Sequence, residues 1–203
     1  MRSSIKALLV LLCAIILALV PGCANSTGNG DGDGDGDGDG HGLGWGRNLA
    51  DAVRDTELPD GSLFNIACID VTDEGEPEEN LPWQFYYAEL PGGPDEDVLI
   101  VVVQYDGSTS TVWETDSSLP LEGLPDYDDA GPWVEAAADA LADEGYPDWS
   151  PRSLFVEPYD GDDFPGTDNW AVLVFVPEDF QGQANVAVDA DTNEVLDVEL
   201  FLP

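Results

Sequence analysis

A short stretch of sequence occurs twice in this chain, in residues 45–64 and again in residues 133–155. Each copy holds a tryptophan, an Ala-Asp-Ala triplet, a Pro-Asp pair and a Ser-Leu-Phe triplet in the same order. The copies are 88 residues apart at the tryptophans and 91 apart at the triplets that begin at Ser62 and Ser153. An internal repeat predicts two fused copies of one folding unit, with three residues inserted in the second.

Each copy opens with apolar residues at the spacing of one helix face. We expect Trp45 and Trp133 to hold matching helix positions, as we expect Leu63-Phe64 to match Leu154-Phe155 in the strands that follow. In the second helix, Asp128 or Asp129 is expected to cap the start, Pro132 to lie in the first turn and Gly145 to end it. The predicted stripes are Trp45, Leu49, Ala52 and Val53, and Trp133, Ala137, Ala140 and Leu141.

Runs rich in β-branched and aromatic residues follow each helix and are separated by short polar turns. Such a succession favours an antiparallel meander with the helix on one face. The sequence therefore predicts an α+β fold of two tandem helix-plus-antiparallel-sheet repeats, and leaves open whether the sheets join side by side or pack face to face. The expected strands are 63–71, 83–87, 98–105 and 111–114, then 154–157, 170–176, 184–190 and 195–201.

The N-terminus indicates export. Arg2 and Lys6 precede an apolar run over residues 7–20, which is typical of a secretory signal and shorter than a spanning helix. The run ends Val-Pro-Gly-Cys and resembles the bacterial lipoprotein box, which implies lipidation of Cys23. An ordinary signal peptide cut near Cys23 is the alternative. The expected organisation is a signal peptide (1–22), a lipidated Cys23 with a disordered Gly/Asp tether (23–42), a first repeat (43–116), a linker (117–130) and a second repeat (131–203).

The tether contains five Asp-Gly pairs. Glycine and like-charge repulsion make such a chain extended. An EF-hand loop needs a glutamate at its twelfth position, and loops that start at Asp31, Asp33 or Asp35 have glycine there. We therefore expect no ordered calcium site in the tether.

The chain is strongly acidic, with 43 Asp and Glu against 5 Lys and Arg and a formal net charge of −38. This charge argues against nucleic acid as a partner, because binding it requires cations that neutralise phosphates. An acidic surface almost without lysine suits a saline habitat, and recognition of a cationic partner is the alternative. Hydrophobic residues make up 43% of the chain, so it can form a core despite its charge.

Catalytic groups are scarce. We expect Cys68 to be a small buried hydrophobe, and the one histidine, His41, falls in the tether. A serine or cysteine nucleophile in the repeats would therefore have no histidine or lysine base. We expect no enzyme and no cofactor, although a carboxylate-based hydrolase stays open as a third hypothesis. Asp189, Asp191 and Asn193 form a partial calcium-like series, which we interpret as a β-turn and not a metal site.

The segment Asn185-Val-Ala-Val-Asp-Ala-Asp-Thr-Asn-Glu-Val-Leu resembles the closing strand pair of PepSY-type domains, with Asn193 where glycine is usual. The tandem of helix and antiparallel sheet is also similar to the PepSY-like group related to β-lactamase-inhibitor proteins. The resemblance implies a secreted module that binds or modulates peptidases without catalytic residues of its own. An unrelated duplicated α+β domain is the alternative.

The sequence thus favours a noncatalytic, lipid-anchored envelope protein outside the cytoplasm, which in a Gram-negative cell would mean the periplasm or outer membrane. Its expected partners are the membrane, through the anchor, and an envelope protein or peptide. The runner-up is a peptidase or hydrolase inhibitor. Trp83, Phe85 and Tyr87 should face the core, and Tyr86, Trp113 and Trp149 are the candidate binding residues.

Overall fold

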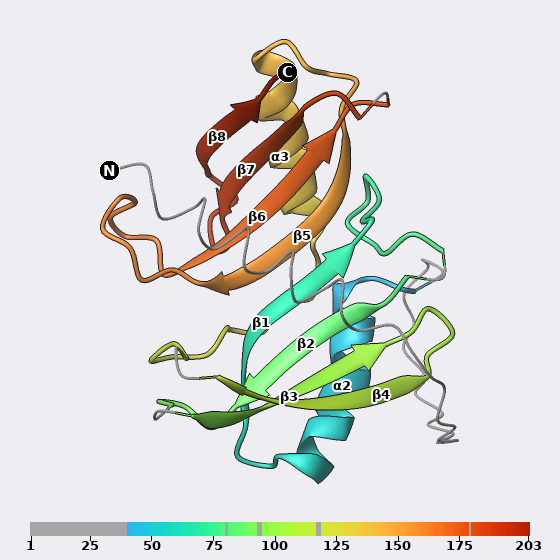
Figure 1. Ribbon diagram of the computed structural model, residues 1–203, viewed down its shortest axis with the longest axis vertical. Helices are drawn as coiled ribbons and strands as arrows, with labels where there is room; N and C mark the ends of the chain where they lie inside the picture. Colours follow the sequence, from blue (N-terminus) through green and yellow to red (C-terminus); the bar gives the residue numbers. More distant parts are fainter. Residues whose placement is uncertain (1–39, 80, 93–94, 117–118, 179) are drawn as a thin grey trace.

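The structure is a computed structural model that describes residues 40–79, 81–92, 95–116, 119–178 and 180–203. The expected signal peptide, Cys23 and nearly all of the tether lie outside the described residues. Both helices lie on the same face of an eight-stranded antiparallel sheet (Figure 1). Among the described residues, no helix has the length and apolarity that crossing a membrane requires.

Each unit consists of one helix followed by four strands, which confirms the predicted α+β class. The first unit comprises α2 (Leu43–Glu57), β1 (Ser62–Ile69), β2 (Trp83–Ala88), β3 (Glu96–Val103) and β4 (Thr109–Asp116). The second comprises α3 (Gly131–Asp143), β5 (Ser150–Pro158), β6 (Asn169–Val176), β7 (Gln183–Asp189) and β8 (Val195–Phe201).

The two sheets join side by side, which answers the question that the sequence left open. The strand order is β4-β3-β2-β1-β5-β6-β7-β8, so each unit is a meander and the first strands of the two units meet in the middle. β1 and β5 pair antiparallel from Ile66↔Val156 to Ile69↔Ser153. We call this β1–β5 junction the seam. Because of the seam, the duplicated units share one sheet.

The Ser-Leu-Phe match predicted from the sequence is wrong. Each first strand carries one bulge residue, Phe64 in β1 and Arg152 in β5, at which its register with the next strand shifts. These bulges are 88 residues apart, as are the first residues of the two strands. Leu63-Phe64 therefore corresponds to Pro151-Arg152, and Leu154-Phe155 lies beyond the bulge. Relative to the bulge, the Ser-Leu-Phe triplet lies three residues farther along β5 than along β1, whereas the two strands begin at equivalent positions.

The main core lies between the sheet and the helices. Trp83, Phe85 and Tyr87 are 0%, 0% and 1% exposed and point into it, as predicted. The alternation of strand side chains between the two faces places them there. Trp133 is buried and its indole N–H donates to the Ala190 carbonyl at 3.0 Å. Trp45, also the third residue of its helix, is only partly buried.

The predicted helix details need two corrections. Ala52 is exposed, because α2 turns Leu43, Gly46 and Ala50 toward the sheet. Gly46 permits this rotation, since a Cβ there would lie 2.7 Å from the Trp83 ring. The residue that precedes α3 is Ala130, not an aspartate, although the Asp129 carboxylate accepts a hydrogen bond from the Gly131 N–H at 2.8 Å.

Candidate binding surface

The face of the sheet opposite the helices, which we call the helix-free face, carries polar and aromatic side chains from both units. Register places Tyr86 of β2 beside Asn65 of β1, and Trp170 of β6 beside Glu157 of β5. Asn65 and Glu157 meet across the seam, where the Asn65 Nδ2 donates to the Glu157 Oε2 at 3.5 Å. These four side chains form a continuous line that neither unit provides alone.

Glu157 is the central charged group of this line. Its Oε1 accepts a hydrogen bond from the Trp170 indole N–H at 3.2 Å. Burial raises the pKa of Glu157, the hydrogen bond from Trp170 acts in the opposite direction, and the charge of Asp160 raises the pKa further. The carboxyl is therefore held by both units and is easier to protonate than an exposed glutamate.

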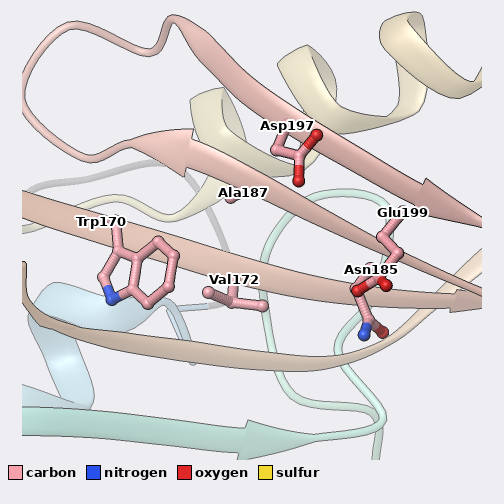
Figure 2. Close-up of a pocket in the computed structure, with 6 residues that line it drawn as sticks. All are labelled: Trp170, Val172, Asn185, Ala187, Asp197 and Glu199. Atoms are coloured by element: carbon pink, nitrogen blue, oxygen red, sulfur yellow. The ribbon is translucent and has the colours of Figure 1, made fainter. Parts of the chain in front are cut away.

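A small hollow adjoins Trp170 on the same face (Figure 2). Val172 and Ala187 lie beside Trp170, and Asn185, Asp197 and Glu199 complete the lining. The ring of Tyr159 approaches the Trp170 ring at 5.0 Å, so aromatic surface continues onto the loop after β5. Aromatic rings beside carboxylates suit a cationic group, which gains both charge attraction and cation–π contact.

Tyr86, one of the candidate residues, lies on the helix-free face. It is half-buried and its hydroxyl donates to the Gln84 Oε1 at 2.8 Å. Burial, with a smaller contribution from Glu114, raises its pKa to about 12. Tyr86 therefore stays protonated and keeps its hydrogen-bond donor at physiological pH.

The other two candidates do not join Tyr86. Trp113 of β4 is 46% exposed and faces the helix side, because its register partner Leu99 points into the main core. Trp149 belongs to the second unit, where it packs against Tyr146 at a ring distance of 4.9 Å. The predicted trio is therefore not one surface. Asn65, Glu157 and Trp170 were not predicted, since the pairing of β5 with β6 places Trp170 beside Glu157 and only the pairing of β1 with β5 adds Asn65.

The Asp189 series forms a turn, as predicted. The Asp189 Oδ1 accepts hydrogen bonds from the N–H groups of Asp191 and Thr192 at 3.0 and 2.9 Å. Asn193 has a φ of 60°, and its N–H donates to the Asp189 carbonyl at 2.9 Å. The carboxylate oxygen thus closes the β7–β8 turn. Within the part of the chain that the structure describes, no cluster of His, Cys, Asp and Glu suits a metal ion.

Cys68 is the buried hydrophobe that we expected, with 1% of its surface exposed. Burial and then the charge of Asp70 raise the pKa of its thiol to about 12. His41, in contrast, is not part of a free tether. Its ring stacks on Tyr105 with a centroid distance of 3.8 Å, and its carbonyl accepts a hydrogen bond from the Trp83 indole at 3.0 Å. The end of the tether is thus fixed to the first unit.

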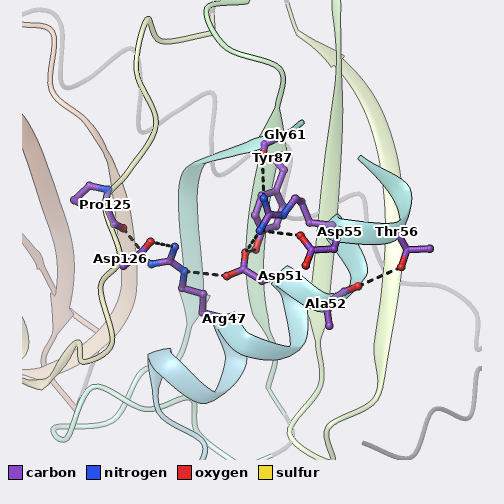
Figure 3. A network of polar contacts seen from close by, with 10 residues as sticks. Arg47, Asp51, Ala52, Asp55, Thr56, Gly61, Tyr87, Pro125 and Asp126 are labelled. Carbon is purple, nitrogen blue, oxygen red and sulfur yellow. Dashed lines mark hydrogen bonds and ion pairs between the residues drawn. The ribbon is translucent and has the colours of Figure 1, made fainter. Parts of the chain in front are cut away.

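The three arginines of the described residues all make ion pairs, and those of Arg47 are drawn in Figure 3. Arg47 pairs with Asp51 in its own helix and with Asp126 in the linker. Arg54 pairs with Asp51 at 3.4 Å, and the Tyr87 hydroxyl donates to the same carboxylate at 3.0 Å.

The third arginine, Arg152, spans the seam and pairs with Asp70 at 2.7 Å. The guanidinium groups therefore engage a few specific carboxylates. In the whole chain, 43 acidic residues face only 5 Lys and Arg.

The fold is similar to that of a putative lipoprotein from Clostridium difficile 630, seen in its crystal structure. The TM-score is 0.51, the identity is 11%, and the match covers 79% of this chain and 99% of that one. At this identity the likeness shows a shared fold alone. No protein-family model matches the chain, and no curated protein matches it significantly. The PepSY-type resemblance therefore stays a hypothesis.

Proposed function

We propose that this protein is a noncatalytic, lipid-anchored binding protein of the cell envelope whose recognition surface is the helix-free face. The location is supported by the lipoprotein box at Cys23, by the acidic tether and by the fold shared with a putative lipoprotein. A tether that ends on the first unit at His41 would hold the folded repeats away from the membrane while keeping them attached.

The observation that carries the binding role is the Asn65–Glu157 contact at the seam. Fusing the two units side by side brings Tyr86 and Trp170 into one line with this contact, on the face that the helices leave uncovered. A polar pair flanked by aromatic rings offers both hydrogen bonds and apolar contact area, the composition that recognition surfaces favour. The duplication would thus have produced one surface from two units.

The noncatalytic part of the proposal rests on chemistry. Residues 43–203 contain neither histidine nor lysine, so a hydroxyl or thiol nucleophile there has no nitrogen base. The third hypothesis, a carboxylate hydrolase, has Glu157 as its best acid, because its pKa is raised. The second hypothesis, an inhibitor or modulator of a peptidase or hydrolase, would use the same face with an enzyme as its partner, and the PepSY-type resemblance favours it.

Photo-crosslinking in the producing cells tests the proposal. A benzoylphenylalanine placed at Gln84, which lies beside Ala67 on the helix-free face, should crosslink to an envelope protein or peptide. The matched control is the same group at Asp139, exposed on α3. Capture of a peptidase or hydrolase from Gln84 alone would select the inhibitor role. Equal yields from both positions, or none from Gln84, would contradict recognition through this face. Glycosidase activity that Glu157→Gln abolishes would favour the hydrolase.

A further inference from the structure

The two ends of the sheet differ. β4 pairs with β3 over eight consecutive residue pairs without a bulge, from Glu96↔Asp116 to Val103↔Thr109. β8, at the other end, has a register shift against Ala187 and Val188 of β7. A bulge twists an edge and hinders the addition of another strand, whereas a regular edge presents backbone N–H and C=O groups that another chain can pair with.

The side chains of β4 also suit strand addition. Its sequence, Thr-Ser-Thr-Val-Trp-Glu-Thr-Asp, is rich in residues that favour strands and has neither proline nor lysine, two devices that commonly protect edges. Trp113, at 46% exposure, stands in the middle of the strand. A tryptophan in such a position can anchor a partner.

The charge at this edge selects the partner. Glu114 and Asp116 lie on β4 itself, and the chain as a whole has a net charge of −38. Carboxylates protect an edge against a second acidic copy of the same chain, because like charges opposite each other destabilise strand pairing. They give no such protection against a cationic chain, which they attract.

We propose that β4 is a docking edge for an extended, cationic peptide segment of another protein. The segment would pair its backbone with β4 as an additional strand of the sheet. One of its apolar side chains would lie on Trp113, and its lysine or arginine side chains would face Glu114. Glu114 borders the helix-free face near Tyr86. The inference nevertheless rests on the backbone edge of β4 and on Trp113, which faces the helix side, so it does not depend on the proposed function.

The test uses the full-length protein in nonionic detergent at about 0.05 M NaCl, where charges are weakly screened. The probe is the peptide acetyl-Lys-Val-Thr-Val-Lys-Val-Thr-amide, titrated calorimetrically and followed by amide hydrogen exchange. Two further peptides have proline in place of the central valine, or glutamate in place of both lysines. The proline peptide keeps the charge but cannot form a regular strand.

The probe should bind and slow the exchange of amides in β4, while the proline and glutamate peptides bind at least about tenfold more weakly. Trp113→Ala should weaken binding about tenfold, in the range of an interface anchor. The matched control is Phe201→Ala at the exposed end of β8, which should leave the affinity unchanged.

Three results would overturn the proposal. The first is equal binding of the probe and its proline analogue, which would show charge attraction alone. The second is an absence of protection in β4 when the probe is saturating. The third is a dimer that protects β4 without any peptide, which would make a second copy the occupant of the edge. The comparison of peptides on the wild-type protein holds even if Trp113→Ala fails to fold.

Discussion

Ala67 of β1 pairs with Phe155 of β5, and the two residues are 88 positions apart, the same separation as the first residues of the two helices. Each is therefore the counterpart of the other in the duplicated units. The flanking pairs, Ile66 with Val156 and Cys68 with Leu154, exchange under the same relationship. A local two-fold axis thus passes through the Ala67–Phe155 pair at the centre of the sheet.

The seam predicts that the two units unfold together. Each unit alone is small and would expose β1 or β5 as an open edge. Val186→Ala, at a fully buried position of β7, should cost about 1–3 kcal/mol through lost burial and a residual cavity. The variant should unfold in a single calorimetric transition with a lower midpoint temperature. It should also show faster hydrogen exchange in β2 of the other unit. Val53→Ala, on the partly buried face of α2, is the milder control. Two transitions, or a stable isolated repeat, would show that the units are autonomous.

The acid excess predicts a strong salt response. Arg47, Arg54 and Arg152 are already engaged in specific ion pairs, so most carboxylates repel one another without compensation. The screening length falls from about 10 Å at 0.1 M salt to about 3 Å at 1 M. The melting temperature should therefore rise by several degrees between about 0.05 and 1 M NaCl. A flat or falling melting temperature would remove the argument for a saline habitat.

Glu157 predicts a particular pH dependence. Its folded pKa is raised, so the folded state holds this proton more tightly than the unfolded chain. Its contribution to the free energy of unfolding is most favourable at pH values below the ordinary glutamate pKa of 4.5. That contribution is lost as the pH rises through the folded pKa. Glu157→Gln removes the buried charge but keeps an oxygen for the Trp170 indole. At pH 7 the variant should have a higher melting temperature than wild type, by about 2–4 °C for each kcal/mol of added stability. The two melting temperatures should converge at the acid end of the pH range.

Asp189 contributes to the acid side of the same profile. Burial acts to raise its pKa, but hydrogen bonds from Thr192, Thr167 and Asp191 lower it overall. Its stabilising contribution is present above the ordinary aspartate value of 3.8 and is lost only as the pH falls through its lowered folded pKa. Acidification to about pH 5 should therefore be tolerated. Thermal melts between pH 3 and 7 check both residues, and a wild-type profile that Glu157→Gln leaves unchanged would contradict the role of Glu157.

The elements could be predicted from the sequence because their signals are local. The alternation of Trp83, Phe85 and Tyr87 with polar neighbours specifies one buried strand face, and the polar turns separate the strands. The observed bounds differ from the predicted ones. β5 begins at Ser150, ahead of the predicted 154, although Pro151 follows at once, because a proline is tolerated near the start of a strand.

The surface could not be predicted because it depends on long-range pairing. Asn65 and Glu157 are 92 residues apart and meet only because the two sheets share a seam. The repeat itself was misleading at one point. The Ser-Leu-Phe triplets of the two copies are 91 residues apart, whereas the bulges of the two equivalent strands are 88 residues apart. The triplet pairing fails because side-chain direction in a strand follows the hydrogen-bonded register.

The claim on which location and function both depend is acylation at Cys23. Its most direct test is the intact mass of the protein purified from membranes of the producing cells, with fragmentation of its N-terminal peptide. We predict a chain that begins at Cys23, carries acyl chains there and becomes soluble when Cys23→Ser blocks the modification. A soluble wild-type chain cut at another position, or a membrane-bound chain that retains residues 1–22 without acylation, would contradict the account.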